Sequence, residues 1–336
     1  MLVLSVFIAA CSGTPKQHPL PELRSGTSGL EFEFLKNAPP AVVFEGSEFP
    51  SILRVKNIGA YSIEEDLALL TLGIERDYTK KVKVEVGGRV ATESSGDIKN
   101  EASFTLPGKT LINAKGEEEI VSFTIEPSKI DPQSETHPTT LIATLCYPYE
   151  TELITSSCID PDPNNIRPTK KSCTVQDTTF SQGQGAPVAI TVVQPQMIPS
   201  ENQIKPQFLI TIENKGKGEV IKPGLYKSIC RGSSTGMDTK ELNRIGMRAW
   251  LSDQELVCSL REDSPVASAT LDTQPSSDGF VRLQSNKEVV RCFYPDSARV
   301  IPKSTDSYTT QLTIQLDYGY VESKATEYTI RKVNAR

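Results

Sequence analysis

The sequence predicts an all-β protein built from two tandem antiparallel β-sandwiches that arose by internal duplication. Almost every periodic segment alternates apolar and polar residues with a period of two, which is typical of a strand with one buried face. A chain of 336 residues suits two domains, each large enough to bury its own core. Segments of the first half also recur in the same order in the second half, which indicates a repeated domain.

Three short segments carry this repeat. They pair residues 52–59 with 209–216, residues 120–127 with 289–295, and residues 145–149 with 316–320. The first pair is an alternating run that ends in Asn-x-Gly, and the last pair contains two tyrosines separated by one residue. Three matches in the same order predict that the two halves share one fold.

The repeat and the local composition divide the chain into five parts. We expect a signal peptide with a lipobox at 1–11, a flexible tether at 12–28, a first sandwich at 29–160, a disulfide-pinned linker at 161–185 and a second sandwich at 186–336. The tether is rich in Ser, Gly, Pro and charge, as flexible connections are.

Each copy is predicted to contain about seven short strands, separated by Gly, Pro, Asn and Asp clusters. In the first copy they cover residues 30–35, 51–56, 67–74, 81–86, 103–106 and 119–125, followed by a hairpin of 140–149 with 152–159. In the second copy they cover residues 188–193, 207–213, 247–252, 279–283, 288–294, 309–320 and 324–332. Only residues 238–244 tolerate a short helix. This pattern predicts two antiparallel sandwiches.

Two Asn-x-Gly sequences close core strands at equivalent places. Asn57 and Gly59 end one alternating run, and Asn214 and Gly216 end the other. Asn and Gly are the residues that most readily adopt a positive φ. We therefore interpret these four residues as structural turns that need a positive φ.

With their closing Tyr-x-Tyr segments, these strands resemble the immunoglobulin-like (Ig-like) modules of the CARDB type on archaeal and bacterial surfaces. The resemblance covers residues 29–160 and 186–333, and the motifs that carry it are short. It implies two Ig-like sandwiches on an exported protein, where such modules commonly act in spacing, adhesion or assembly. The family brings no catalytic residues, and it does not require the cysteines of this chain.

The N-terminus predicts export and lipid attachment. Residues 2–10 form an apolar run that is too short to cross about 30 Å of hydrocarbon but has the form of a signal-peptide core. Residues 8–11, Ile-Ala-Ala-Cys, resemble the lipobox of prokaryotic lipoproteins, in which the cysteine is acylated and becomes the new N-terminus. Cys11 is therefore the predicted lipidation site, on a membrane-anchored protein that faces the periplasm or the cell exterior. An ordinary cleaved signal or a chance hydrophobic start is the alternative.

Seven cysteines fit an oxidising compartment. If Cys11 carries lipid, six remain, and six cysteines allow 15 pairings. Cys258 and Cys292 lie where a sandwich could place them on neighbouring strands, so we favour a bridge between them. Cys158 ends the first copy and Cys173 lies 15 residues later, so that a bridge between them would pin the linker.

The remaining two cysteines, Cys146 and Cys230, are harder to join. Cys146 lies near the predicted hairpin turn, at the pole opposite the linker. In an end-to-end arrangement the two thiols are too far apart for the Cα separation of roughly 4.4–6.8 Å that a disulfide needs. We therefore expect Cys146 to be free, paired elsewhere or bonded to another chain.

Composition argues against several kinds of chemistry. The net charge of −6 lacks the basic excess of nucleic-acid binders, so no nucleic-acid partner is predicted. The two histidines, His18 and His137, belong to no spaced metal set, and a catalytic triad would have to use His137. We predict no enzyme activity and no cofactor.

One acidic sequence has the spacing of calcium ligands. Asp160, Asp162 and Asn164 occupy alternate positions, as the first oxygen ligands of calcium loops do. The following glycine and the distal glutamate of such loops are missing. A solvated acidic linker is therefore the simpler interpretation, and a loosely bound calcium ion between the domains is the alternative.

These features predict a non-enzymatic exported lipoprotein with a structural, adhesion or envelope-assembly role. Its expected partners are the membrane, through the lipid, and other envelope or surface proteins. The alternative is a surface protein that binds a glycan or a peptide through distal loops or a sandwich face. Sugar binding usually needs exposed aromatic rings. The candidates for such rings are Trp250, which we interpret as a core residue, and the pairs Tyr147/Tyr149 and Tyr318/Tyr320.

Overall fold

The computed structural model describes residues 23–90, 98–168, 170–232, 241–260 and 279–333. Over these residues the chain is almost entirely β-structure, with one α-helix, α1 (Tyr226–Cys230), and one 3-10 turn (Arg76–Tyr78). The strands of the first half are β1 (Leu30–Phe34), β2 (Val42–Phe44), β3 (Phe49–Asn57), β4 (Ile63–Gly73), β5 (Thr79–Val86), β6 (Arg89–Val90), β7 (Glu101–Leu106), β8 (Glu118–Pro127) and β9 (Thr136–Ile159). Those of the second half are β10 (Thr178–Thr179), β11 (Val188–Pro199), β12 (Gln203–Asn214), β13 (Glu219–Ile221), β14 (Arg244–Leu251), β15 (Gln254–Glu255), β16 (Val257–Cys258), β17 (Phe280–Arg282), β18 (Lys287–Phe293), β19 (Ile301–Pro302) and β20 (Tyr308–Arg331).

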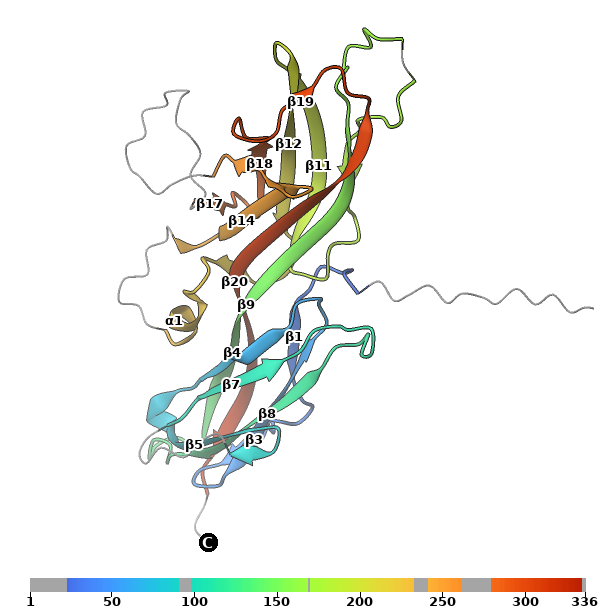
Figure 1. Cartoon of the computed structure of the whole chain (residues 1–336). Coiled ribbons are helices and arrows are strands. Elements are labelled where there is room, and N and C mark those ends of the chain that lie inside the picture. The colour runs from blue at the N-terminus through green and yellow to red at the C-terminus, as the bar shows by residue number, and fades with distance from the viewer. Residues whose placement is uncertain (1–22, 91–97, 169, 233–240, 261–278, 334–336) are drawn as a thin grey trace, which may run out of the picture.

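The strands form three mainly antiparallel sheets (Figure 1). One sheet of the first half has the order β1-β3-β8-β5-β6, and one sheet of the second half has the order β10-β11-β12-β18-β16, with β19 beside β12. The third sheet follows the path β15-β14-β20-β9-β4-β7 and so contains strands of both halves. β13, β17 and β2 pair at its margins, β2 in parallel orientation.

The third sheet is organised by its two longest strands. β9 and β20 contain 24 residues each and pair antiparallel over their whole length, from Tyr308 opposite Ile159 to Arg331 opposite Thr136. Figure 1 shows this two-stranded ribbon running through both halves of the molecule. Each long strand therefore belongs to both halves.

The sequence predicts an interruption in the middle of each of these strands, and neither strand is interrupted. The predicted hairpin of 140–149 with 152–159 and the predicted break after residue 320 are wrong. Burial keeps alternating through the middle of β9, so one face of the strand stays in the core on both sides of its centre. Pro148 is tolerated there because β4 leaves β9 at Cys146, and a proline, which has no N–H, fits a strand with a free edge.

Two sandwiches result, which we call the first lobe and the second lobe. In the first lobe the sheet β1-β3-β8-β5-β6 packs on β7, β4 and the adjoining halves of β9 and β20. In the second lobe the sheet β10-β11-β12-β18-β16 packs on β14 and the other halves of the same two strands. The predicted all-β class with two antiparallel sandwiches is confirmed, but the sandwiches are interlocked by the ribbon and do not follow one another along the chain. Their cores include Phe32, Leu53 and Phe123 in the first lobe and Phe208 and Ile314 in the second.

The helix lies where the sequence predicts none. Helix α1 packs on the ribbon near its centre, where Tyr226 and Cys230 are buried with Leu69 and Cys146 and contact the partly buried Val321. A five-residue helix is too short to be stable by propensity alone, so tertiary contacts hold it.

In the described part of the predicted helix at 238–244, Glu241 has 3-10 conformation and no residue is α-helical. Residues 238–240 lie outside the described residues, and β14 begins at Arg244. Within the described part of the chain, no helix has the length and hydrophobicity that crossing a bilayer requires.

Candidate functional site

Four tyrosines meet where the ribbon passes from one lobe into the other. Tyr147 lies opposite Tyr320, Tyr149 lies opposite Tyr318, and at most 2 % of each residue is exposed. Adjacent rings have centroids 5.7–6.4 Å apart. Burial raises the pKa of all four phenols, that of Tyr320 to about 12. We call this cluster the tyrosine waist.

Two of these phenols hold the start of a strand in each lobe. The Tyr147 hydroxyl accepts a hydrogen bond from the backbone N–H of Leu30, the first residue of β1, at 3.3 Å. The Tyr318 hydroxyl accepts one from the backbone N–H of Val188, the first residue of β11, also at 3.3 Å. The same contact is therefore made once in each lobe.

The Asn-x-Gly segments lie beside the other two phenols. In both segments the Asn side chain accepts from the Gly N–H at 3.1 Å and donates to a carbonyl oxygen four residues later. The residues involved are Asn57, Gly59 and Tyr61 in the first lobe, and Asn214, Gly216 and Gly218 in the second.

The reason predicted for these turns is wrong. Neither the two glycines nor the asparagines before them have a positive φ. A Cβ at Gly59 would instead lie 1.8 Å from the Tyr149 hydroxyl oxygen, and a Cβ at Gly216 would lie 2.1 Å from that of Tyr320. Glycine is needed in both segments because a phenol approaches the backbone too closely for any side chain.

Three disulfides cross-link the described residues. Cys258–Cys292 joins β16 to β18, and Cys158–Cys173 joins the end of β9 to the connection that follows it; the sequence favours both bridges. Three bridges in one chain are typical of proteins that fold in an oxidising compartment outside the cytoplasm.

The third bridge corrects the sequence analysis. Cys146 and Cys230 are bonded, with Cα atoms 5.9 Å apart. The expectation that they are too distant depends on a hairpin that would place Cys146 at an outer pole. Because β9 continues into the second lobe, Cys146 lies at the centre of the ribbon, where α1 reaches it.

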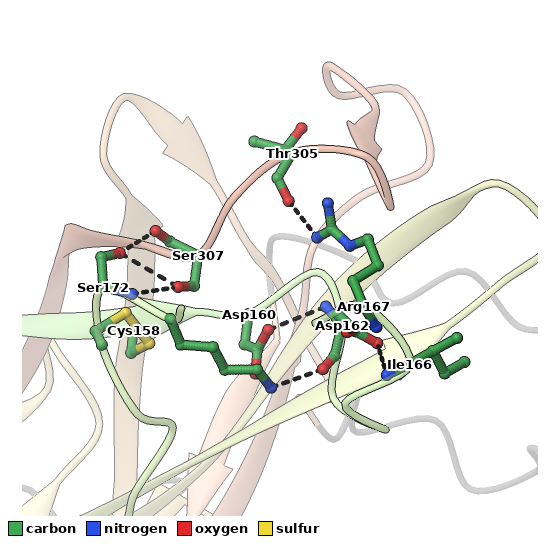
Figure 2. Close-up of polar contacts among 10 residues, drawn as sticks. Cys158, Asp160, Asp162, Ile166, Arg167, Ser172, Thr305 and Ser307 are labelled. Atoms are coloured by element: carbon green, nitrogen blue, oxygen red, sulfur yellow. Dashed lines mark hydrogen bonds and ion pairs between the residues drawn. A yellow bond between two sulfur atoms is a disulfide. The ribbon is translucent and has the colours of Figure 1, made fainter. Parts of the chain in front are cut away.

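At the far end of the second lobe, the connection after β9 is held against the turn before β20 (Figure 2). The Arg167 guanidinium donates to the carbonyl oxygens of Ser304 and Thr305, at 2.9 and 2.7 Å. The Ser172 N–H donates to the Ser307 hydroxyl at 2.8 Å. We call these contacts, together with the Cys158–Cys173 bridge, the distal clamp.

Two of the candidate calcium ligands, Asp160 and Asp162, lie in the same connection as the clamp residues. Asp162 accepts hydrogen bonds from the backbone N–H groups of Arg167 and Ile166, at 2.8 and 2.9 Å, and these bonds lower the pKa of its carboxyl group. Asp160 accepts from the N–H of Asp162 and forms an ion pair with Lys171 (Figure 2). Both carboxylates are therefore partnered within the loop.

This geometry gives the calcium alternative no support. The ammonium group of Lys171 lies where a cation at Asp160 would have to bind, and Asn164 is exposed. In the described ranges, no three His, Cys, Asp or Glu side chains are grouped so that they could hold a metal ion. The alternating oxygen side chains serve a capped loop.

A cavity of about 390 Å³ lies beside the clamp, between the end of β9 and β11. None of its lining side chains is charged, and half of them carry hydroxyl groups, among them Thr155, Ser157, Thr174 and Thr309. Ser157 is 5 % exposed, and its hydroxyl oxygen has no hydrogen-bond partner among the described residues. Buried polar groups are normally paired, so this cavity is the most informative concave site in the described chain.

His137 is the histidine that the structure describes, and it is not placed as a catalytic base. It stacks on Tyr78 with ring centroids 3.8 Å apart, and its Nε2 lies 2.9 Å from a carboxylate oxygen of Glu75. This contact lowers the pKa of Glu75. No serine, threonine or cysteine of the described chain is hydrogen-bonded to the imidazole. His18 and Cys11 lie outside the described residues, and lipidation at Cys11 stays a prediction.

The aromatic rings that a sugar would need are mostly unavailable. The four tyrosines of the waist are buried. The prediction that Trp250 is a core residue is wrong, because the buried face of β14 carries Met247, Ala249 and Leu251. Trp250 is half-buried on the opposite face, with the guanidinium carbon of Arg248 5.3 Å from its ring centroid.

No family model matches the chain, and no curated protein matches it in sequence. Among solved structures, the chain is similar to the CARDB domain of a Pyrococcus furiosus protein in complex with di-metal ions. The identity is 15 % over 40 % of this chain and 80 % of that domain, with a TM-score of 0.19. It is also similar to the B domain of a biofilm associated protein, at 7 % identity over 87 % of this chain and 72 % of that one, with a TM-score of 0.22. A CARDB domain, the type that the sequence resembles, is thus among these structures. Both TM-scores are below 0.5, so the fold described above rests on the strand pairing itself.

Two residues that shape the distal end of the second lobe, Lys171 and Ser157, are not among the site residues predicted from the sequence. Lys171 follows the acidic sequence in the same connection, and this charge pattern could have indicated an internal ion pair. Ser157 lies in a run of small polar residues, 155–157. The equivalent residue of the second copy is the large Tyr328, and this difference in size could have indicated a space beside Ser157.

Proposed function

We propose that this chain is a non-enzymatic, exported lipoprotein that serves as a rigid structural unit in an envelope assembly or in adhesion. The observation that carries the proposal is the shared ribbon. Because β9 and β20 pass through both lobes, the lobes cannot swing about a linker as tandem domains do. The three disulfides favour a location in an oxidising compartment.

The position of the N-terminal segment supports anchoring at the middle of the molecule. The Gly26 N–H donates to the carbonyl oxygen of Gln182 at 2.7 Å, and the Gly185 N–H donates to that of Gly26 at 2.8 Å. Figure 1 shows the described chain beginning beside the centre of the ribbon. An anchor at Cys11 would therefore leave the far ends of both lobes free for contacts with other proteins.

Replacement of the predicted lipidation site tests the anchor. We expect Cys11→Ala to move the protein from the membrane fraction to the soluble fraction, because stable retention needs the acyl chains that this cysteine would carry. Ser12→Ala is the matched control and should leave the protein in the membrane fraction. Unchanged fractionation of Cys11→Ala, or an intact Met1 in the mass spectrum of the mature protein, would refute the anchor.

A further inference from the structure

One edge of β9 is free over the second lobe. β4 pairs with β9 only up to Cys146, and β20 occupies the other edge throughout. Among the described strands, none pairs with the free edge of β9 from Pro148 to Ile159. Unpaired backbone groups on a strand edge are a template for another strand.

Among the described strands, none pairs with the matching edge of β20 at residues 322–328 either, but in the first lobe the core beneath this edge is filled. Tyr147 of β9 and Tyr318 of β20 make the same contact, so these two residues are equivalent in the repeat. Ser157 lies ten residues after Tyr147, and Tyr328 lies ten residues after Tyr318. Ser157 in the second lobe is therefore equivalent to Tyr328 in the first lobe. Tyr328 is 4 % exposed, and its ring lies 5.0 Å from that of Phe49. β2 pairs with the residues that follow it.

A lysine, Lys324, also lies on this edge of β20 in the first lobe. Lys324 donates to the carbonyl oxygen of Phe32 in β1, and its ammonium group lies 4.8 Å from the centroid of the Phe32 ring. Lysines on strand edges prevent the addition of a further strand. The first lobe therefore has both a filled core and a protected edge at this position.

The second lobe has neither of these features. Where the first lobe places the Tyr328 ring, the second lobe has the unpaired hydroxyl of Ser157 and the cavity of about 390 Å³. Residues 153–159 contain no charged residue and no proline. The chain that runs from the Cys158–Cys173 bridge to β10 lines the cavity with Thr174 and Gln176 but does not pair with β9.

We infer that this cavity and the free edge of β9 form a docking site for an extended peptide segment of a partner protein. The segment would add a strand to residues 153–159 and insert one large aromatic side chain into the cavity. The uncharged lining selects an uncharged segment. A tyrosine suits the site best, because Val193, Pro195 and Leu312 offer apolar contact to its ring and the Ser157 hydroxyl offers a partner for its phenol. This inference builds on the proposed assembly role but does not depend on the lipid anchor.

Hydrogen exchange with a defined peptide tests the site. The probe is the neutral peptide acetyl-Ser-Thr-Val-Tyr-Val-Thr-Ser-amide, added to the full chain that carries Cys11→Ala. We expect the amides of residues 153–159 to exchange at least about tenfold more slowly with saturating peptide, because strand addition ties up edge groups. The edge of β20 at 322–328 is the internal control and should not change. The same peptide with alanine for tyrosine should bind about tenfold more weakly.

Two variants separate the cavity from the strand edge. Ser157→Tyr reproduces the first lobe and should abolish peptide binding by filling the cavity. Ser157→Ala keeps the cavity open and should retain binding of the tyrosine peptide within a few-fold. Should Ser157→Tyr fail to fold, the comparison of the tyrosine and alanine peptides on the protein that keeps Ser157 still shows whether the cavity contributes to binding.

Three results would overturn the inference. If neither peptide protects residues 153–159 from exchange, the cavity and the strand edge are not a peptide-binding site. Equal binding of both peptides would remove the role of the cavity. Protection that rises with protein concentration in the absence of peptide would identify a second copy of this chain as the occupant. None of these results bears on the fractionation of Cys11→Ala, so the two proposals fail independently.

Discussion

At the scale of single residues, the same close contact occurs twice. In each lobe a phenol from the ribbon passes over a glycine of an Asn-x-Gly segment, and the Asn side chain closes the turn. The hydroxyl groups are satisfied by backbone partners such as the N–H of Leu30 and that of Val188. Because these polar groups are buried, each lost partner would leave an unpaired group at a cost of about 1–3 kcal/mol.

Substitution of the glycines measures this contact. We expect Gly59→Ala and Gly216→Ala each to lower the free energy of unfolding by about 1–3 kcal/mol, because the new Cβ overlaps a buried phenol. Urea denaturation of each variant gives the value. Gly246→Ala is the matched control, since its Cβ would meet the carbonyl oxygen of Asp317 at an ordinary 3.5 Å and its φ is not positive. Equal stability of Gly59→Ala and Gly246→Ala would mean that the phenol moves aside at no cost.

The buried phenols also predict how stability depends on alkaline pH. Burial raises their pKa, that of Tyr320 to about 12 and that of Tyr328 to about 12, above the value of about 10 in the unfolded chain. Their contribution is fully present below pH 10 and is lost as the pH rises towards 12, because the unfolded state then binds fewer protons. Each such tyrosine should lower the unfolding free energy by about 1.4 kcal/mol per pH unit in this window.

Rapid denaturant unfolding at a series of alkaline pH values checks this slope. Tyr320→Phe is the informative variant, since it removes one titrating group and should make the decline shallower. A decline equally steep in wild type and Tyr320→Phe would show that Tyr320 is not the group responsible.

At the scale of elements, long strands and one short helix meet at the middle of the chain. β9 presents Cys146 on the face opposite its buried tyrosines, and α1 covers that face. Since α1 contains only five residues, its position depends on the bridge from Cys230 and on packing against Leu69.

The loss of stability on removing a disulfide should increase with the length of chain that the disulfide closes. Cys146–Cys230 spans 84 residues and Cys158–Cys173 spans 15. The loop-entropy model assigns them roughly 4.5 and 3 kcal/mol. We therefore expect the double variant Cys146→Ser/Cys230→Ser to be less stable in urea than Cys158→Ser/Cys173→Ser, and to exchange the amides of 226–230 faster.

Peptide mapping without reductant provides the independent check. A crosslinked peptide pair that contains Cys146 and Cys230 within one chain is expected. Detection of Cys146 joined to a second chain, or as a free thiol, would contradict the bridge.

At the scale of the whole molecule, the lobes are joined by pairing and not by a linker. The ribbon of β9 and β20 runs through both lobes, and each lobe uses one half of each strand (Figure 1). Residues 320–331, from the end of the chain, pair with the beginning of β9 in the first lobe. Neither half of the sequence therefore contains all the strands of one sandwich.

This arrangement predicts one cooperative unit. We expect a single unfolding transition by calorimetry, with calorimetric and van 't Hoff enthalpies in agreement. Fragments 23–185 and 186–333 should each lack a cooperative transition alone, because each exposes an unpaired half of a long strand, and should regain one when mixed. Two separate transitions in the intact chain, or a fragment that folds by itself, would contradict the interlocked fold.

The sequence by itself determined the local structure. Alternation of apolar residues located most strands to within a few residues, for example 119–125 against the observed Glu118–Pro127. It also determined the all-β class and favoured two of the three disulfides. These features depend on neighbours along the chain, and a local pattern can record them.

Only the tertiary structure decided which residues, distant in the sequence, contact one another. Alternation continues unchanged through the middle of β9, and it carries no mark that says whether the strand turns back or continues into a second lobe. The partner that keeps β9 extended, β20, begins about 150 residues later, and the bridge at Cys146 follows from that pairing. The need for glycine at Gly59 and the open place beside Ser157 likewise arise from side chains that approach from distant strands, where contacts between residues far apart in the sequence decide the geometry.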